Sequence, residues 1–537
     1  MEKVACWIAE CDRNHYECKP FSSGSWVPTR LLYFGNPGEP PRLVITSAYE
    51  SRRKPKYTTL SHCWGSTLTL KLTTATLNVF LQGISPSDIP KTYADAIEVS
   101  RVMKVDHIWI DSLCIIQDSE TDWNRECGQM AEVYKNGYCN IAASHAIDSH
   151  GGCFSMRDPA RLRPLVLHSR WRGPEGIDLW EWRLGSDSDA APLSRRGWVL
   201  QETTLSPRTL YFGTVMISWS CRTILARENS RPHPRETVAL VYRGQEIDEA
   251  GLREFLVIWN ATVERYTSAA LTYPSDKLVA ISAVAKELQK IFDNGLTGKF
   301  IYLAGLWTSS LESQLLWETP EPSPTPRVAG RAPTWSWASI DSPIHTRGPA
   351  QPYIHAQVAD YRLVPRGNDA FLAVDCDLST IDIRGRCWKL SEDFLHQSQV
   401  ELGYYMRMVL GWDVAVVPPS VREPTYLLPI LGGEFNRGIG QQHLKGLMLR
   451  RTNLTPEIWE RVGIFQIDEV RRYYSRFSYA DHPDDWRAQI AEVGLSLGFF
   501  GPMSGHTLEG VPDDSEYRKR LNGYVKEMDT MILVRIK

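Results

Sequence analysis

The run Ile108-Trp-Ile-Asp-Ser-Leu-Cys-Ile-Ile-Gln117 places a carboxylic acid, Asp111, and a thiol, Cys114, in an otherwise apolar stretch. A buried carboxylate must be paired, hydrogen-bonded or protonated, and each of these states costs stability. Cys114 could act as a nucleophile if His62 served as its base and Asp111 oriented the imidazole. In a regular strand Asp111 and Cys114 would point to opposite faces, so this relay requires a bend near Ser112. The alternative for Cys114 is a place in the core, because free cysteine is among the most buried residue types.

The N-terminal segment spaces four residues with metal-binding side chains, Cys6, Cys11, His15 and Cys18, as C-x4-C-x3-H-x2-C. Thiolates and an imidazole this close together can hold a tetrahedral zinc ion, and we predict Cys11, His15 and Cys18 as its ligands. The alternative is a short amphipathic helix that buries Trp7 and Cys11. The chain has 11 cysteines, and this odd number favours reduced thiols or a metal site over a disulfide framework.

The composition excludes several classes of function. The net charge is only −3 over 537 residues, which gives no electrostatic basis for binding nucleic acid or an anionic membrane surface. No segment reaches the roughly 18 consecutive apolar residues that span a bilayer, and residues 1–7 have no apolar core for a secretion signal. We therefore expect an intracellular, cytoplasmic protein, long enough for two to four domains.

Strand and helix patterns alternate between residues 57 and 143. The β-branched or apolar runs at 57–62, 107–115 and 139–143 predict strands, and helical spacing of apolar residues predicts helices at 92–103 and from Ser119 onward. Strand–helix–strand–helix–strand order predicts an α/β fold with a mostly parallel sheet flanked by helices. Ligands of such sheets bind beyond the carboxyl ends of the strands, where His62, Asp111 and Cys114 lie or nearly lie.

Around this edge we predict a ligand site. Its ligand-binding residues are Ser61, Trp64, Arg196 and Glu202. Arg196 could bind a phosphate, for example in a nucleotide or another small molecule. The alternatives remain open: His62 could be a satisfied core histidine, and Arg196 and Glu202 could tie the domain to the region that follows through a buried network. Asp111 could have a structural role instead of a catalytic one, as the cap of a helix or as an acceptor for the amides of the Cys63-Trp-Gly65 turn.

The sequence as a whole divides into five predicted regions. Residues 1–52 form an N-terminal segment with the Cys/His cluster, and residues 53–202 form the α/β domain. Residues 203–317 are mainly helical in composition, although strands are expected around Thr209–Phe212 and Val215–Ser220. Residues 318–333 hold five prolines and predict a linker. Residues 334–537 predict a mixed, mainly β region.

Four ordered motifs resemble the fungal heterokaryon incompatibility (HET) domain. They are Thr59-Leu-Ser-His-Cys-Trp-Gly65, Trp109-Ile-Asp-Ser-Leu-Cys-Ile-Ile-Gln117, Asp122-Trp-x-x-Glu126 and Arg196-Gly-Trp-Val-Leu-Gln-Glu202. Further pieces resemble the helical and β-rich C-terminal extension common in such proteins: Ala332-Pro-Thr-Trp-Ser-Trp-Ala338, Tyr426-Leu-Leu-Pro429 and Gly446-Leu-Met-Leu-Arg-Arg451. The resemblance implies a role in non-self recognition during fungal cell fusion and in programmed cell death, with a protein partner or self-association.

The resemblance also implies a distant likeness to Toll/interleukin-receptor domains, some of which cleave NAD with a glutamate that follows a tryptophan by four residues. Here Glu126 follows Trp123 by three. A carboxylate at Glu126 could stabilise positive charge at an anomeric carbon, so we predict Glu126 as a catalytic residue for NAD hydrolysis. The alternative is a glutamate paired with Arg125, Arg101 or another basic group at the edge of the domain. Two other classes remain open: a small-molecule enzyme that uses Cys114, His62 and Asp111, and a binding or oligomerising module without chemistry.

Overall fold

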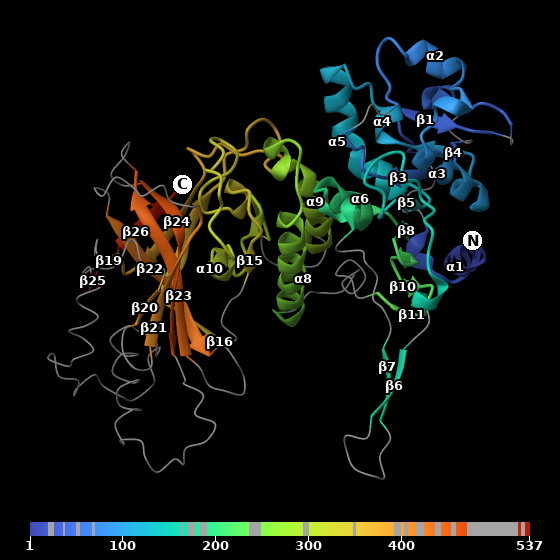
Figure 1. The fold of residues 1–537 in the computed structure, drawn as a ribbon. Helices are drawn as coiled ribbons and strands as arrows, with labels where there is room; N and C mark the ends of the chain where they lie inside the picture. Colours follow the sequence, from blue (N-terminus) through green and yellow to red (C-terminus); the bar gives the residue numbers. More distant parts are fainter. Residues whose placement is uncertain are drawn as a thin grey trace. The chain divides into compact units, whose positions relative to one another are not determined.

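The computed structural model divides the chain into two compact units (Figure 1). Unit 1 comprises Met1–Ile258 and Ala269–Leu271, and unit 2 comprises Trp259–Ser268 and Thr272–Lys537. The structure describes residues 1–19, 26–35, 38–49, 54–66, 70–162, 165–169, 178–182, 191–235, 249–293, 300–346, 351–390, 399–401, 406–414, 424–434, 442–452, 458–469, 525–527 and 532–537. Of the helices in these ranges, none is long and apolar enough to cross a membrane.

Unit 1 is built on one mixed sheet, in which nine strands of the described residues take the order β11-β10-β9-β8-β5-β3-β4-β1-β2. The strands are β1 (Arg30–Tyr33), β2 (Arg42–Ile45), β3 (Tyr57–Ser61), β4 (His107–Trp109), β5 (Asn140–Ala142), β8 (Arg208–Phe212), β9 (Ile217–Cys221), β10 (Ile224–Arg227) and β11 (Ser230–Pro234). The neighbours β8, β5, β3 and β4 run parallel, whereas every pairing outside this centre is antiparallel. The α/β class is therefore confirmed. The prediction of a mostly parallel sheet is correct only for the central strands β8, β5, β3 and β4.

The helices of unit 1 lie on both faces of this sheet. They are α1 (Glu2–Asn14), α2 (Leu77–Gln82), α3 (Lys91–Val102), α4 (Asp111–Cys114), α5 (Glu120–Asn136) and α6 (Trp198–Leu205), with 3-10 turns η1 (Tyr16–Cys18), η2 (Thr46–Ala48), η3 (Pro86–Asp88), η4 (Pro159–Leu162) and η5 (Pro192–Arg195). On β3, the Tyr57 hydroxyl donates to the Val133 carbonyl of α5 at 2.8 Å, and the next hydroxyl, Thr58, bonds Ser100 of α3 at 2.7 Å. Because successive strand side chains point to opposite faces, α3 and α5 cover opposite faces of the sheet.

Most of the predicted elements between residues 57 and 143 are present, but the strand expected over 107–115 is wrong beyond Trp109. The backbone turns at Ile110, whose carbonyl accepts hydrogen bonds from the amides of Leu113 and Cys114, and α4 follows as a single helical turn. The Asp111 carboxylate accepts the Ser112 amide at 2.7 Å, which stabilises the start of this turn. The bend near Ser112 that a relay would need is therefore present.

Predictions from the sequence outside residues 57–143 were partly correct. In the N-terminal segment β1 pairs with β2, and β1 was missed in the sequence. The strands expected around Thr209–Phe212 and Val215–Ser220 correspond to β8 and β9, and they extend the same sheet beyond residue 202. A separate hairpin joins β6 (Leu165–Ser169) to β7 (Asp178–Trp182). Helix α8 (Glu249–Thr267) is divided between the two units.

Unit 2 contains a second, largely antiparallel sheet. Its main path is β17-β18-β26-β24-β23-β22-β19-β25, and β16, β20 and β21 pair at its sides. These strands are β16 (Gln351–Ile354), β17 (Gln357–Arg362), β18 (Thr380–Gly385), β19 (Trp388–Leu390), β20 (Gln399–Glu401), β21 (Met406–Trp412), β22 (Thr425–Glu434), β23 (Gln442–Arg451), β24 (Ile458–Glu469), β25 (Val525–Glu527) and β26 (Ile532–Ile536). The preceding part holds η6 (Pro274–Lys277), α9 (Val279–Asp293), β12 (Tyr302–Leu303), β13 (Leu306–Trp307), α10 (Leu311–Gln314), β14 (Trp317–Glu318), η7 (Trp337–Ser339) and β15 (His345–Thr346).

The proline-rich segment 318–333 lies within unit 2 and contacts its core. Arg327 donates to Asp413 at 2.7 Å, and Asp413 also receives two hydrogen bonds from Arg461, which is fully buried. Arg331 is buried as well and pairs with Asp341 at 2.7 Å. These contacts hold the segment against the unit at several points.

Candidate functional site

His62 stands at the centre of a polar cluster beyond the carboxyl end of β3. Its side chain is buried, and its Nε2 atom lies 3.0 Å from the Tyr93 hydroxyl, which in turn lies 2.8 Å from the Ser112 hydroxyl. Its Nδ1 atom lies 3.8 Å from Asp111 Oδ1 and has no hydrogen-bond partner among the described residues. Burial lowers the pKa of His62 to about 4, although the charge of Asp111 acts in the opposite direction. His62 is therefore neutral at neutral pH.

Asp111 is one of the residues of this cluster that reach solvent. It follows β4 after one residue, Ile110, and its side chain is 16% exposed. Trp64 donates its indole N–H to Asp111 Oδ2 at 2.9 Å, while Oδ1 accepts the Ser112 amide. The carboxylate is thus held in one orientation by two donors, and part of its surface stays open to a further donor.

Arg196 and Glu202 complete the cluster from the segment around α6. The partly exposed Arg196 donates to the backbone carbonyl of His62. Burial acts to lower the pKa of Arg196, but the carboxylates of Glu202 and Asp111 outweigh it and raise that pKa. Burial raises the pKa of Glu202, while Arg196 and hydrogen bonding with Ser61 oppose the shift. Glu202 is 2% exposed, and its Oε2 atom has no hydrogen-bond partner within the described part of the chain.

Cys114 is not part of the polar cluster around His62. Its thiol is fully buried, and burial raises its pKa to about 12, which opposes formation of the thiolate that a nucleophile needs. Its carbonyl accepts a hydrogen bond from Arg30 Nε at 2.7 Å. The contacts of His62, by contrast, are with Tyr93, Asp111 and Arg196. These contacts fit the core alternative for Cys114 better than the nucleophile.

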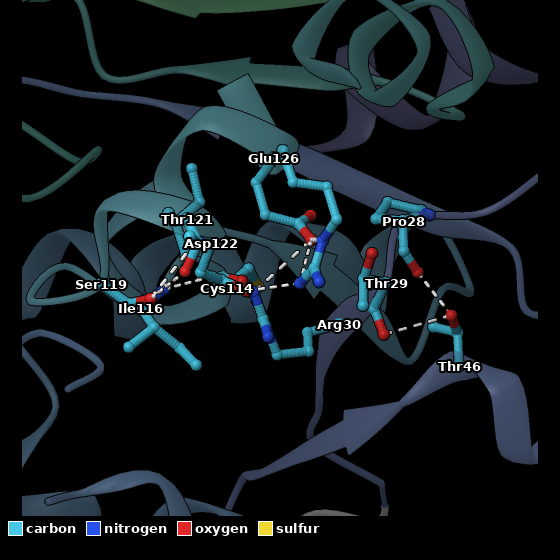
Figure 2. A network of polar contacts seen from close by, with 12 residues as sticks. Pro28, Thr29, Arg30, Thr46, Cys114, Ile116, Ser119, Thr121, Asp122 and Glu126 are labelled. Carbon is cyan, nitrogen blue, oxygen red and sulfur yellow. Dashed lines mark hydrogen bonds and ion pairs between the residues drawn. The ribbon is translucent and has the colours of Figure 1, made fainter. Parts of the chain in front are cut away.

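Glu126 belongs to a second polar cluster, which joins α5 to β1 (Figure 2). Its Oε1 atom lies 3.6 Å from the Arg30 guanidinium and 3.1 Å from that of Arg125. Arg30 also pairs with Asp122 at 2.5 Å, and Asp122 accepts the amide of Ile116 at 2.9 Å. Glu126 is 2% exposed and Arg30 is buried. The contacts therefore fit the alternative in which Glu126 pairs with Arg125, and they add Arg30 as a second partner.

Residues 57–202 match the family model described as heterokaryon incompatibility protein (HET). This segment is a HET domain. The match links the chain to heterokaryon incompatibility at the level of the family. A search of curated proteins found no match, and neither did a search of solved structures.

The HET domain brings together most of the residues predicted as a site. His62, Asp111, Ser61, Trp64, Arg196 and Glu202 all contribute to the cluster around His62. Two members were missed in the sequence. Tyr93 lies on the face of α3 that packs inward, where its helical spacing resembles that of core residues, and Ser112 gave no signal beyond its position next to Asp111.

A third cluster lies outside the matched HET segment and contains the predicted metal ligands. Cys11, His15 and Cys18 come together with Cys221 at the end of β9, and their ligand atoms all lie within 4.8 Å of one another. Hydrogen bonding with Cys11 and Cys221 lowers the pKa of the Cys18 thiol. Cys6, which shares the sequence motif, is exposed and stands outside the cluster. Cys221 was missed, because it is 206 positions from His15 along the chain and has no local motif.

Proposed function

We propose that the chain acts in fungal non-self recognition, and that its HET domain promotes cell death after a small polar ligand binds beside His62. The supporting observation is that two buried polar atoms of this cluster, His62 Nδ1 and Glu202 Oε2, lack hydrogen-bond partners among the described residues. An unsatisfied buried polar atom costs about 1–3 kcal/mol, and a bound ligand is one way in which a protein satisfies such an atom. A ligand that forms hydrogen bonds with them recovers that free energy.

The side chains of the cluster define the ligand class. Asp111 and Glu202 are acceptors for ligand hydroxyl groups, and Arg196 offers a cationic donor for a phosphate. A ribose-bearing nucleotide carries both kinds of group. NAD is the first candidate, since it carries two ribose sugars and a diphosphate, and the likeness of HET domains to NAD-cleaving Toll/interleukin-receptor domains points the same way.

If the bound NAD is hydrolysed to nicotinamide and ADP-ribose, the contacts favour Asp111 over Glu126 as the carboxylate beside the anomeric carbon. The Asp111 side chain is 16% exposed, and no arginine among the described residues forms a direct ion pair with it. Glu126 is 2% exposed and engaged by two guanidinium groups. A carboxylate already neutralised by arginines stabilises an oxocarbenium-like charge poorly.

The test combines binding with survival. Calorimetric titration of the purified chain with NAD should give saturable binding, and induced expression in a fungal host should reduce survival. Arg196→Gln should weaken binding at least tenfold and restore survival. The neighbouring Arg195 is exposed, so Arg195→Gln is a matched control that should behave like the unmodified chain. Equal binding and equal survival for the two variants would refute the site, and no loss of survival on expression would refute the cell-death role.

Nicotinamide release separates binding from hydrolysis. Purified chain incubated with NAD should release nicotinamide, and Asp111→Asn should abolish the release while Glu126→Gln keeps it if the protein remains folded. Loss of release in a folded Glu126→Gln variant, with release unchanged in Asp111→Asn, would return the catalytic role to Glu126.

A further inference from the structure

The N-terminal cluster of three thiols and one imidazole has the composition and spacing of a metal centre. Cys11 lies on α1, His15 follows this helix, Cys18 ends η1, and Cys221 ends β9. The three cysteines are fully buried and His15 is 8% exposed. A tetrahedral zinc ion, with Zn–S distances of about 2.3 Å and a Zn–N distance of about 2.0 Å, keeps its ligand atoms about 3.5–3.8 Å apart. The 4.8 Å limit on the present separations is close to this, and Cys221 Sγ lies 3.4 Å from His15 Nδ1.

The groups that surround the sulfur atoms also fit thiolates. Arg208 donates from Nε to Cys11 Sγ at 3.1 Å, and the backbone amide of Ile224 donates to Cys221 Sγ at 3.4 Å. Donors of this kind orient metal-bound thiolates and stabilise their charge. A guanidinium donor beside a buried sulfur atom fits a thiolate better than a neutral thiol, because the charge of the donor stabilises the thiolate.

The charge balance points in the same direction. Three thiolates, a neutral imidazole and a divalent cation carry a total charge of −1. Arg208 is 3% exposed and supplies one positive charge next to Cys11, while its other end pairs with Asp12, whose side chain is 46% exposed. The ion, its ligands and Arg208 together are therefore neutral, which is the state that a buried site favours.

We propose that Cys11, His15, Cys18 and Cys221 bind one structural zinc ion that attaches the N-terminal helix to the sheet of unit 1. Four protein ligands leave no open coordination position, so the ion stabilises the fold and takes no part in a reaction. It joins a short local motif to strand β9. The N-terminal segment thereby becomes part of the unit that contains the HET domain, which begins only at residue 57 in the family match.

Metal analysis of the full-length chain tests this proposal directly. The chain purified without chelator should contain about one zinc per molecule, and Cys221→Ser should lose most of it. Cys153→Ser is a matched control, because Cys153 is another fully buried thiol of unit 1 outside the cluster. It should keep its zinc. Cobalt exchanged into the unmodified chain should give the visible absorption of a tetrahedral thiolate site.

A second variant covers the case in which Cys221→Ser fails to fold. His15→Cys replaces the imidazole by a fourth thiolate, and because four thiolates also form tetrahedral zinc sites, this variant should keep about one zinc. Less than half an equivalent of zinc in the unmodified chain, or full zinc in Cys221→Ser, would overturn the proposal. An intact mass lower by two hydrogen atoms, which indicates a disulfide within the cluster, would overturn it as well.

Discussion

Two buried charge clusters in unit 1 differ in how completely their groups are paired. In the cluster around Arg30, two arginines face two carboxylates, and each carboxylate contacts both arginines. In the cluster around His62, two carboxylates face one arginine and a neutral histidine, and two polar atoms lack hydrogen-bond partners among the described residues. A complete network needs nothing further and holds elements together. An incomplete one retains an energetic cost that a ligand can remove, and on this difference we propose a structural role for the first cluster and a functional role for the second.

The largest effect is expected from breaking the complete cluster. Arg30→Met should reduce the free energy of unfolding by about 3–5 kcal/mol, because it leaves the carboxylates of Asp122 and Glu126 buried with only Arg125 to pair them. The side chain of Arg125 is 53% exposed, so Arg125→Met should cost no more than about 1 kcal/mol. Urea unfolding followed by circular dichroism measures both. Equal losses for the two variants would show that burial does not decide the strength of this network.

The pH dependence of the free energy of unfolding should further distinguish the cluster around His62 from the cluster around Arg30. The pKa of His62 in the folded chain is about 4, below its ordinary value of 6.5, so the unfolded chain binds the proton first as the pH falls. The free energy of unfolding should therefore decrease between about pH 6.5 and pH 4, by up to about 3 kcal/mol at roughly 1.4 kcal/mol per pKa unit. His62→Gln should remove this part of the decrease.

Glu202 has the opposite effect on the pH dependence of the free energy of unfolding, so its contribution must be measured separately from that of His62. Its pKa is raised in the folded chain, so its protonation on acidification favours folding. The comparison is therefore best made in a Glu202→Gln background, with and without His62→Gln. A pH dependence that is identical in these two variants would mean that His62 has its ordinary pKa and is not desolvated.

The sequence predicted the incomplete cluster better than the complete one, for a physical reason. His62 and Asp111 follow neighbouring parallel strands, and the ends of such strands meet at one edge whatever lies between them. The partnership of Arg30 with Asp122 spans 92 positions and depends on β1, a strand that lies in a segment without a clear pattern. Cys221 was missed because it lies 206 positions from His15 and has no local motif. The turn at Asp111 was missed because a short apolar run fits a buried strand and a buried turn equally well.

A smaller effect is expected from removing the thiol of Cys114. Cys114→Ala leaves a small cavity in a fully buried position, and it should cost about 1–2 kcal/mol in unfolding free energy. Ligand binding and the survival phenotype should be unchanged. Unfolding by urea and the expression assay together decide the matter, since a variant with full stability but no phenotype would restore Cys114 as the nucleophile.

The smallest effect on stability should come from Glu202→Gln, although this carboxylate is 2% exposed. The substitution removes a charge whose burial already costs free energy, and it also removes a partner of Arg196, so the two changes offset each other to within about 1 kcal/mol. The amide cannot accept hydrogen bonds at both of its terminal atoms, so NAD binding should weaken by about tenfold. Calorimetric titration measures this loss in a protein whose melting temperature is nearly unchanged. A large fall in stability with unchanged binding would instead make Glu202 an equivalent of Glu126, and the two clusters would then have the same structural role.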